Sequence, residues 1–234
     1  MKWMVFSDTH LGSAVNHRCK DLYTLVESKQ FDRLIILGDF LDLWRAKYSK
    51  IIKNKDNLKL MNYVLRELPE QGVEVYYIFG NHEDTDKDLL RAEFPNVKFA
   101  ELLVNFNIVL THGNQFDPSV QGERRLKSIK LSKTRQFIES LFHINLRKIG
   151  ILIDEFLHLG ITKRFVKKIH DKVIGRYLSQ YKAAIIGHTH CHKQKQISNS
   201  FFGSDHFTLY DSGNTYTDLN YFLFENGNLI ESGK

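Results

Sequence analysis

The sequence contains little cysteine and proline and no long hydrophobic run. Among its 234 residues there are 2 cysteines and 3 prolines. Two cysteines are too few for a disulfide framework, so the composition predicts a cytoplasmic protein rather than a disulfide-rich secreted one. No stretch reaches the roughly 18 consecutive apolar residues of a membrane span. The apolar run Trp3–Phe6 is too short for a signal-peptide core, and we therefore expect no secretory signal.

Positive charge is concentrated in one part of the chain. The net charge is +6, but the segment from Pro118 to Lys182 alone contains 15 Lys and Arg against 5 Asp and Glu. Such an asymmetry indicates an anionic partner, which could be a lipid surface, a nucleotide or a nucleic acid. The alternative is a set of solvated helices whose lysines serve only solubility.

Short apolar runs alternate with helix-like stretches in the first part of the chain. The pattern predicts strand, helix, strand, helix and strand, in the order Lys2–Phe6, Arg18–Lys29, Arg33–Leu37, Asn57–Leu68 and Val73–Phe79. The second helix is expected to stop at Pro69, because proline cannot continue a helix. This alternation is typical of βαβ units around a largely parallel sheet.

The second part of the chain is expected to begin with a hairpin and to end in strands. The hairpin would pair Val97–Leu103 with Asn107–Thr111, and a helical region follows over Gln121–Tyr181. Later strands are expected at Ala184–Gly187, His192–Ile197, Phe207–Asp211, Asn220–Phe224 and Leu229–Glu231, the last two joined by a turn at Asn226-Gly227. We therefore predict one domain over 1–234, with two sheets face to face, helices outside and residues 121–181 inserted as a helical lid.

Five of the predicted strands lead directly into residues that bind metals. The five motifs are Asp8-Thr9-His10, Gly38-Asp39-Phe40-Leu41-Asp42, Gly80-Asn81-His82-Glu83, Thr111-His112-Gly113 and Gly187-His188-Thr189-His190. Loops at the carboxyl ends of parallel strands converge on one crevice. Carboxylates, imidazoles and amide oxygens suit hard and borderline divalent cations. Each motif alone is weak, but all five in this order indicate a metal site.

The spacing within the motifs suggests how the ligands converge. On an extended strand end, residues one apart point to the same side, which would bring Asp8 and His10 together and likewise His188 and His190. Two cations about 3.5–4 Å apart need a bridging anion, and Asp39 could supply it. Glycines, which allow tight turns, stand directly before Asp39, Asn81 and His188.

Taken together, the motifs resemble the calcineurin-like metallophosphoesterase superfamily over nearly the whole chain. The resemblance implies an α/β fold, a four-layer α/β/β/α sandwich, and a centre of two divalent cations. One ion would be held by Asp8, His10, Asp39 and His190, and the other by Asp39, Asn81, His112 and His188. Mn²⁺ would be the preferred cation, and Fe, Zn, Mg, Ni and Co are alternatives.

The resemblance also implies hydrolysis of a phosphate ester by a hydroxide that bridges the two cations. Asp39 and His82 would be the catalytic residues. His82 would contact the phosphoryl group and protonate the leaving oxygen, while Asp42 would orient a ligand. No covalent intermediate is required.

The helical region resembles that of the UDP-diacylglucosamine pyrophosphohydrolase branch of the superfamily. It combines an apolar stripe, Ile138, Leu141, Phe142, Ile149, Leu152, Ile153, Phe156 and Leu157, with the basic residues Arg147, Lys148, Lys163, Arg164, Lys167 and Lys168. The resemblance implies a nucleotide- or lipid-linked phosphate or pyrophosphate as substrate. A basic amphipathic helix also suits peripheral contact with the inner face of the membrane. The alternative is that the stripe only packs the insertion onto the sandwich. The chain departs from the branch at Asn114, where Asp is expected, and at His82, where Arg is usual.

Two alternative functions remain open from the sequence. One is a general phosphatase or phosphodiesterase, including one that acts on nucleic acid. The basic residues of this segment alternate with Leu, Ile and Phe more than with aromatic residues on which bases could stack. An amphiphilic substrate is therefore favoured over nucleic acid. The other alternative is a non-catalytic scaffold with the same fold, which the presence of every ligand and of His82 disfavours. The sequence makes no prediction of oligomeric state.

Overall fold

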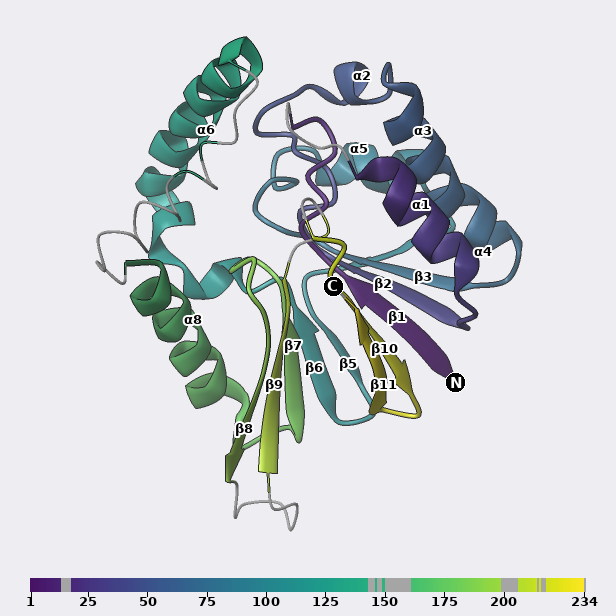
Figure 1. The fold of residues 1–234 in the computed structure, drawn as a ribbon, viewed down its shortest axis with the longest axis vertical. Helices are drawn as coiled ribbons and strands as arrows, with labels where there is room; N and C mark the ends of the chain where they lie inside the picture. Colours follow the sequence, from purple (N-terminus) through teal and green to yellow (C-terminus); the bar gives the residue numbers. More distant parts are fainter. Residues whose placement is uncertain are drawn as a thin grey trace.

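Two β-sheets pack face to face, with helices on their outer faces (Figure 1). The computed structural model describes residues 1–13, 18–142, 146, 149, 161–198, 206–213, 215 and 218–233. Within this part, the layers follow the order α/β/β/α. The predicted fold class is therefore confirmed.

The first sheet is formed mainly from the N-terminal part of the chain. Its strand order is β11-β10-β1-β2-β3-β4, with bounds Asn228–Gly233, Tyr221–Glu225, Lys2–Phe6, Arg33–Leu37, Glu74–Ile78 and Lys98–Ala100. Strands β1 to β4 are mutually parallel, and β10 pairs antiparallel with β1. The predicted Asn-Gly hairpin joins β10 to β11, with φ of 50° at Asn226 and 78° at Gly227. Positive φ at both central residues suits the twist of paired strands.

The second sheet is formed from later strands. Its order is β5-β6-β7-β9-β8, with bounds Leu103–Asn105, Ile108–Thr111, Ala183–Ile186, His206–Ser212 and His192–Ser198. Strands β6, β7 and β9 are parallel, so their carboxyl ends lie at one edge. Between the sheets, Trp3, Val5 and Ile35 pack against Ile108 and Ile185. Strands covered on both faces are apolar throughout, which explains their unbroken apolar runs.

The outer face of the first sheet is covered by several short helices. These are α1 Cys19–Ser28, α2 Tyr48–Ile51, α3 Lys55–Asn62, the π-helical turn η1 Tyr63–Glu67, α4 Leu68–Glu70 and α5 Lys87–Glu93. The predicted helix end at Pro69 is wrong, because the helix continues to Glu70. Leu68 N–H bonds to Tyr63 O across the wider π-turn, and Pro69 then stands in the first turn of α4, where no N–H donor is needed.

The predicted strand Val97–Leu103 is also wrong in its extent. The chain bends at Glu101 and divides it into β4, which pairs with β3 in the first sheet, and β5, which pairs with β6 in the second. The predicted hairpin therefore begins only at Leu103. The bend carries the chain from one sheet to the other.

Two longer helices lie in the region predicted to form a lid. After the short 3-10 turns η2 Asn114–Phe116 and η3 Pro118–Val120 come α6 Gly122–Phe142 and α8 Ile161–Tyr177. Helix α8 packs through Ile169, Val173 and Tyr177 on the outer face of the second sheet (Figure 1). Arg147, Lys148, Leu152, Ile153, Phe156 and Leu157 lie outside the described residues. Of the predicted stripe, Ile138 is half-buried, and Leu141 and Ile149 are exposed.

Helix α6 turns a polar face inward and exposes apolar and basic side chains on its outer face. Its inner face carries mainly polar residues, Arg125, Ser128, Ser132, Arg135, Gln136 and the fully buried Glu139. On the outer face, Leu126, Leu131, Phe137 and Leu141 are 59–69% exposed. No helix within the described residues is both long and apolar enough to cross a membrane.

Candidate metal centre

The seven predicted ligands all follow the carboxyl ends of parallel strands. Asp8 and His10 come after β1, Asp39 after β2 and Asn81 after β3, while His112 follows β6, and His188 and His190 follow β7. Each sheet therefore supplies part of the set. His188 and His190 are half-buried and the other five are buried.

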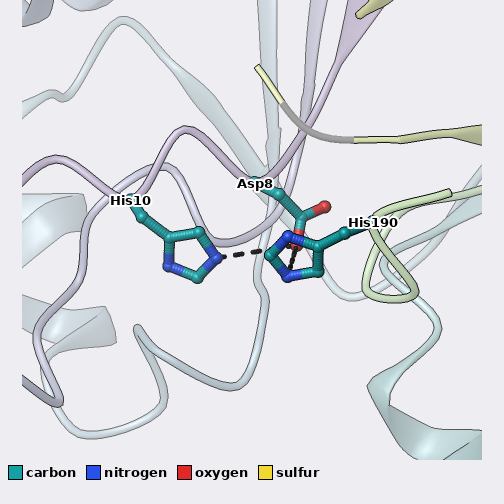
Figure 2. Close-up of side chains that lie close together, drawn as sticks. All are labelled: Asp8, His10 and His190. Carbon is teal, nitrogen blue, oxygen red and sulfur yellow. Dashed lines mark ion pairs between the residues drawn. The ribbon is translucent and has the colours of Figure 1, made fainter. Parts of the chain in front are cut away.

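Six of the seven side chains, all but Asn81, form three overlapping groups of donor atoms together with His82. Within each group the atoms lie within 4.8 Å of one another, and the groups are Asp8, His10 and His190; His10, Asp39 and His82; and Asp39, His112 and His188. Figure 2 shows the first of these, with His10 and His190 beside the Asp8 carboxylate. Asp8 Oδ1 lies 3.1 Å from His190 Nε2 and 3.7 Å from His10 Nε2. Residues from opposite ends of the chain thus meet in one crevice.

Asp39 lies at the centre of the cluster. Its Oδ2 atom is 3.3 Å from His112 Nε2, 3.8 Å from His82 Nε2 and 3.9 Å from His10 Nε2. Its Oδ1 atom accepts a hydrogen bond of 2.9 Å from the His82 backbone N–H. The Asp39 carboxylate therefore faces His10, a predicted ligand of one ion, and His112, a predicted ligand of the other. A bridging ligand must have this position.

Five of the seven candidate ligands have a left-handed backbone. The φ angles are 54° at Asp8, 48° at His10, 51° at Asp39, 61° at His188 and 57° at His190. The expectation that each Asp-x-His or His-x-His pair lies on an extended strand end is therefore wrong. Left-handed backbone is uncommon outside glycine and, when the surrounding structure holds it, is concentrated at functional sites.

Two glycines are required by close approach between loops. A Cβ added to Gly80 would overlap the Asp39 carboxylate, and one added to Gly187 would lie 2.7 Å from both Asp8 Oδ2 and Ser7 Oγ. Neither position has room for a side chain. These glycines allow loops from different strands to approach the crevice together.

The available donor atoms fit divalent cations. Within the described part of the chain, Asn81 Oδ1 is buried and has no hydrogen-bond partner. Asp8 Oδ1 and His112 Nε2 are also buried without a hydrogen bond and have only ion-pair contacts within the cluster. Leaving a buried polar atom without a partner costs about 1–3 kcal/mol, so native proteins seldom retain one unless it has a role. Carboxylate, amide and imidazole donors together form a set that such cations prefer.

Two histidines are held in defined tautomers. The Leu37 carbonyl can only accept, so His112 Nδ1 carries the proton in their 2.8 Å hydrogen bond, and Nε2 is left as the donor to a metal. Similarly, His188 Nε2 lies 2.9 Å from Asp117 Oδ2, which leaves Nδ1 for a metal. Hydrogen bonds of this kind orient metal-binding histidines. The sequence analysis missed Asp117, because nothing local relates it to His188.

The electrostatics of the cluster favour positive charge. Burial lowers the pKa of His112, but the Asp39 and Asp8 carboxylates outweigh it and raise that pKa to about 10. Burial likewise lowers the pKa of His10, whereas Asp42, Asp8 and Asp39 raise it to about 9. Burial raises the pKa of Asp39, but His112 and His82 hold it well below its usual range. The site therefore attracts cations, whether protons or metals.

His82 is held on two sides. Its Nδ1 lies 2.7 Å from Asp42 Oδ1, and the Trp44 ring stacks on it with a centroid distance of 4.4 Å and an interplanar angle of 18°. Asp42 Oδ2 also lies 3.6 Å from His10 Nδ1. Asp42 is thus in a position to orient two histidines.

Glu83 connects the loops that follow β2 and β3. It is fully buried and accepts hydrogen bonds from the backbone N–H groups of Asp39, Leu41 and Gly80, and from the Tyr77 hydroxyl. Burial and the charge of Asp39 raise its pKa to about 7. The sequence analysis quoted Glu83 within its motif but gave it no role.

A pocket of about 170 Å³ lies next to the cluster. It is lined by His10, Trp44, Arg45, His82, Ser132, Arg135 and His190. Of the basic residues predicted for substrate binding, Lys163, Arg164, Lys167 and Lys168 are exposed on α8. The last three line a separate surface hollow instead. Arg45 and Arg135 were missed because their approach depends on the placement of α6.

One of three comparisons with known proteins identifies a family. The family model described as calcineurin-like phosphoesterase matches residues 1–192. A search of curated protein sequences returned no significant match. Among solved structures, a metallophosphoesterase from Sphaerobacter thermophilus is 11% identical, with 99% of this chain and 88% of that one covered and a TM-score of 0.43.

Two further structures illustrate the range of similar proteins. The Zn²⁺ complex of Vps29 from Entamoeba histolytica is 14% identical, with 96% of this chain and 86% of that one covered and a TM-score of 0.39. The nuclease MPE from Pseudomonas putida is 22% identical, with 47% and 53% covered and a TM-score of 0.36. At these values neither structure informs on substrate.

Proposed function

The chain belongs to the calcineurin-like phosphoesterase family and is a metal-dependent phosphoesterase, and we propose that seven residues at the strand ends hold two divalent cations for this reaction. Asp8, His10, Asp39 and His190 would hold one, and Asp39, Asn81, His112 and His188 the other. The observation that carries the proposal is the Asp39 carboxylate, which faces donor atoms of both groups. We propose Mn²⁺ as the native metal, with Fe, Zn, Mg, Ni and Co as alternatives.

Two bound cations would neutralise the phosphoryl oxygens and lower the pKa of a water molecule. Hydrogen bonds within the chain orient the Asp8 carboxylate. Asp8 Oδ2 accepts hydrogen bonds from Ser7 Oγ, at 2.5 Å, and from His188 N–H, at 3.0 Å, which directs its Oδ1 atom toward His10 and His190. Fixed donors and acceptors of this kind avoid reorganisation during the reaction.

His82 would donate a proton to the leaving oxygen. The Asp42 carboxylate occupies His82 Nδ1 and Trp44 stacks on the ring, so Nε2 is left for the substrate. A general acid must lie within hydrogen-bond reach of the group that it protonates. His82 lines the pocket next to the cluster, where the leaving group would lie.

The test is reconstitution of activity. Protein stripped of metal should regain hydrolysis of 4-nitrophenyl phosphate when Mn²⁺ is added. Asp39→Asn should lose this activity by at least about 100-fold, because removal of one electrostatic element at an active site typically costs about that much. Asp88→Asn, at a side chain that is 99% exposed, is the matched control and should behave as wild type. Undiminished activity in excess chelator would contradict the proposal.

For the substrate, we favour a nucleotide- or lipid-linked phosphate or pyrophosphate, such as UDP-diacylglucosamine. The support is the outer face of α6, where Leu126, Phe137 and Leu141 lie exposed beside Lys127, Lys130 and Lys133. Apolar and basic side chains on one face suit an anionic lipid surface. We propose that the enzyme acts in the cytoplasm, at the inner face of the membrane. A panel of UDP-diacylglucosamine, UDP-N-acetylglucosamine and 4-nitrophenyl phosphate tests this, and a preference for the last would contradict it.

A further inference from the structure

Two arginines line the pocket beside the candidate metal centre, although neither belongs to the predicted metal site. Arg45 comes from the loop after β2 and Arg135 from the inner face of α6. They approach the same pocket from separate elements. The pocket of about 170 Å³ is smaller than the roughly 300–1,000 Å³ of sites for drug-sized ligands. It therefore suits a group of the size of a phosphate rather than a nucleoside.

Arg45 is held in place by several contacts. Its Nε atom donates a 2.8 Å hydrogen bond to Ser132 Oγ, and its Nη1 atom donates one of 3.0 Å to Ser13 Oγ. Nε also lies 3.2 Å from Asp42 Oδ2. The side chain is only 11% exposed. Such a guanidinium is fixed before any substrate arrives, which reduces the entropy lost on binding.

Arg135 retains most of its hydrogen-bonding capacity. Its Nε atom donates a 2.8 Å hydrogen bond to Glu139 Oε1, and the two Nη atoms make no hydrogen bond within the described part of the chain. A guanidinium has five N–H donors, so four are available. The side chain is 29% exposed, as expected at the wall of an open pocket. Its planar fork matches the oxygens of a phosphate.

The two arginines contact two buried carboxylates, those of Glu139 and Asp42. The fully buried Glu139 lies between the arginines, with Oε2 3.6 Å from Arg45 Nη1. Asp42 is shared among Arg45, His82 and His10. Glu139 therefore contacts both guanidinium groups, whereas Asp42 contacts Arg45 and two histidines. An anion beside the reacting phosphoryl group would accept hydrogen bonds from the Nη atoms of Arg135.

We propose that Arg45 and Arg135 bind an anionic group adjacent to the phosphoryl group that is cleaved, and thereby select diphosphates over simple phosphomonoesters. This inference rests on the proposed function for its reaction, narrows the substrate class to diphosphates and names the residues that select them. The two arginines act on the part of the substrate that the metals do not hold. Ser132 lies on α6, one turn before Arg135, and accepts a hydrogen bond from Arg45. This contact holds the helix at the pocket.

The direct test is binding of inorganic pyrophosphate to the Mn²⁺-loaded protein, measured by calorimetry. Arg135→Gln should raise the Kd at least about 10-fold, because a charge-assisted hydrogen bond is lost. Arg135→Lys, which keeps the charge but not the fork, should lie between the two. Arg124→Gln, on the exposed face of the same helix, is the matched control and should bind as wild type. Absence of pyrophosphate binding by wild type, or equal binding by Arg135→Gln, would overturn the inference.

Kinetics separate this inference from the proposed function. With Mn²⁺, Arg135→Gln should lose at least about 10-fold in kcat/KM on UDP-N-acetylglucosamine and less than about 3-fold on 4-nitrophenyl phosphate. Equal losses on both substrates would overturn the selective role. If wild type cleaves only the aryl phosphate, the inference fails and the phosphoesterase stands. If it cleaves neither, the proposed function fails, and pyrophosphate binding still decides the inference.

Discussion

Among single residues, Glu83 holds the loops of the centre together through four hydrogen bonds. Its carboxylate receives three backbone N–H groups and one hydroxyl. We expect Glu83→Ala to lower the free energy of unfolding by about 3–5 kcal/mol, because several buried donors lose their acceptor. Urea denaturation measures this change. Glu101→Ala, at a 65% exposed side chain paired with Lys87, should cost less than about 1 kcal/mol. Similar losses in the two variants would contradict the role of Glu83.

Asp117 acts on a candidate ligand rather than as one. It accepts the His188 Nε2 proton and so leaves Nδ1 to bind metal. We expect Asp117→Ala to weaken Mn²⁺ binding by about 10–100-fold, with a smaller loss for Asp117→Asn, whose oxygen can still accept. Calorimetric titration provides the measurement and Asp88→Asn the control. Unchanged affinity in Asp117→Ala would show that the carboxylate does not govern the ligand.

At the scale of elements, a buried chain of polar contacts connects α8 to the loop after β7. His170 Nε2 on α8 lies 2.7 Å from Asp211 Oδ2 on β9, and the Thr189 hydroxyl donates to the same oxygen. Burial raises the pKa of Asp211, so its ionised form depends on these partners. The loop that carries His188 and His190 is therefore held to a helix of the predicted lid.

Removal of His170 should loosen this connection. We expect His170→Ala to reduce the free energy of unfolding by about 3 kcal/mol, because Asp211 stays buried without its main partner. Hydrogen exchange at the amides of Thr189 and Cys191 should also become faster. Lys167→Ala, on the exposed face of α8, is the control and should change stability by less than about 1 kcal/mol. Unaltered hydrogen exchange at Thr189 and Cys191 would show that α8 does not hold this loop of the metal centre.

The accuracy of the sequence analysis also differs among elements. Strands β1 and β2 have the predicted bounds, because a buried apolar run ends there in polar residues. The continuation of the helix past Pro69 was not predicted, because the π-helical turn that permits it has no local sequence pattern. The candidate ligands were predicted to converge, and all but Asn81 lie in the overlapping groups of donor atoms. Asp117 and Arg135 could not be found, because their neighbours are set by how η3 and α6 fold back over the sheets.

At the scale of the whole molecule, the candidate ligands come from both sheets. A cation held by residues of the two sheets would bind only when these lie face to face, so metal binding should stabilise the folded state. At a thousandfold excess over Kd, each Mn²⁺ site should add about 4 kcal/mol to the free energy of unfolding. Urea denaturation with Mn²⁺ and with chelator compares the two states. The gain should be lost in Asp39→Asn, and equal stability of wild type under both conditions would contradict the linkage.

The outer face of α6 predicts attachment of the whole molecule to lipid. Wild type should sediment with vesicles that contain anionic lipid and should be released by salt, because part of the attraction is electrostatic. Phe137→Glu and Leu141→Glu together should reduce binding at least about 10-fold. Ile230→Glu, at a 48% exposed position on β11, controls for an added charge elsewhere. If wild type stays in solution with both neutral and anionic vesicles, lipid is not the partner of this face.

The left-handed backbone of the candidate ligands has a consequence for protein engineering. A designer who transfers the seven side chains to another scaffold would copy the chemistry and lose the geometry. The recipient must also provide φ angles of 48–61° at the positions of Asp8, His10, Asp39, His188 and His190. Most scaffolds provide such angles only at glycine. The unit that can be transplanted is therefore the set of strand-end loops together with the neighbouring glycines, and any graft smaller than that should bind metal weakly.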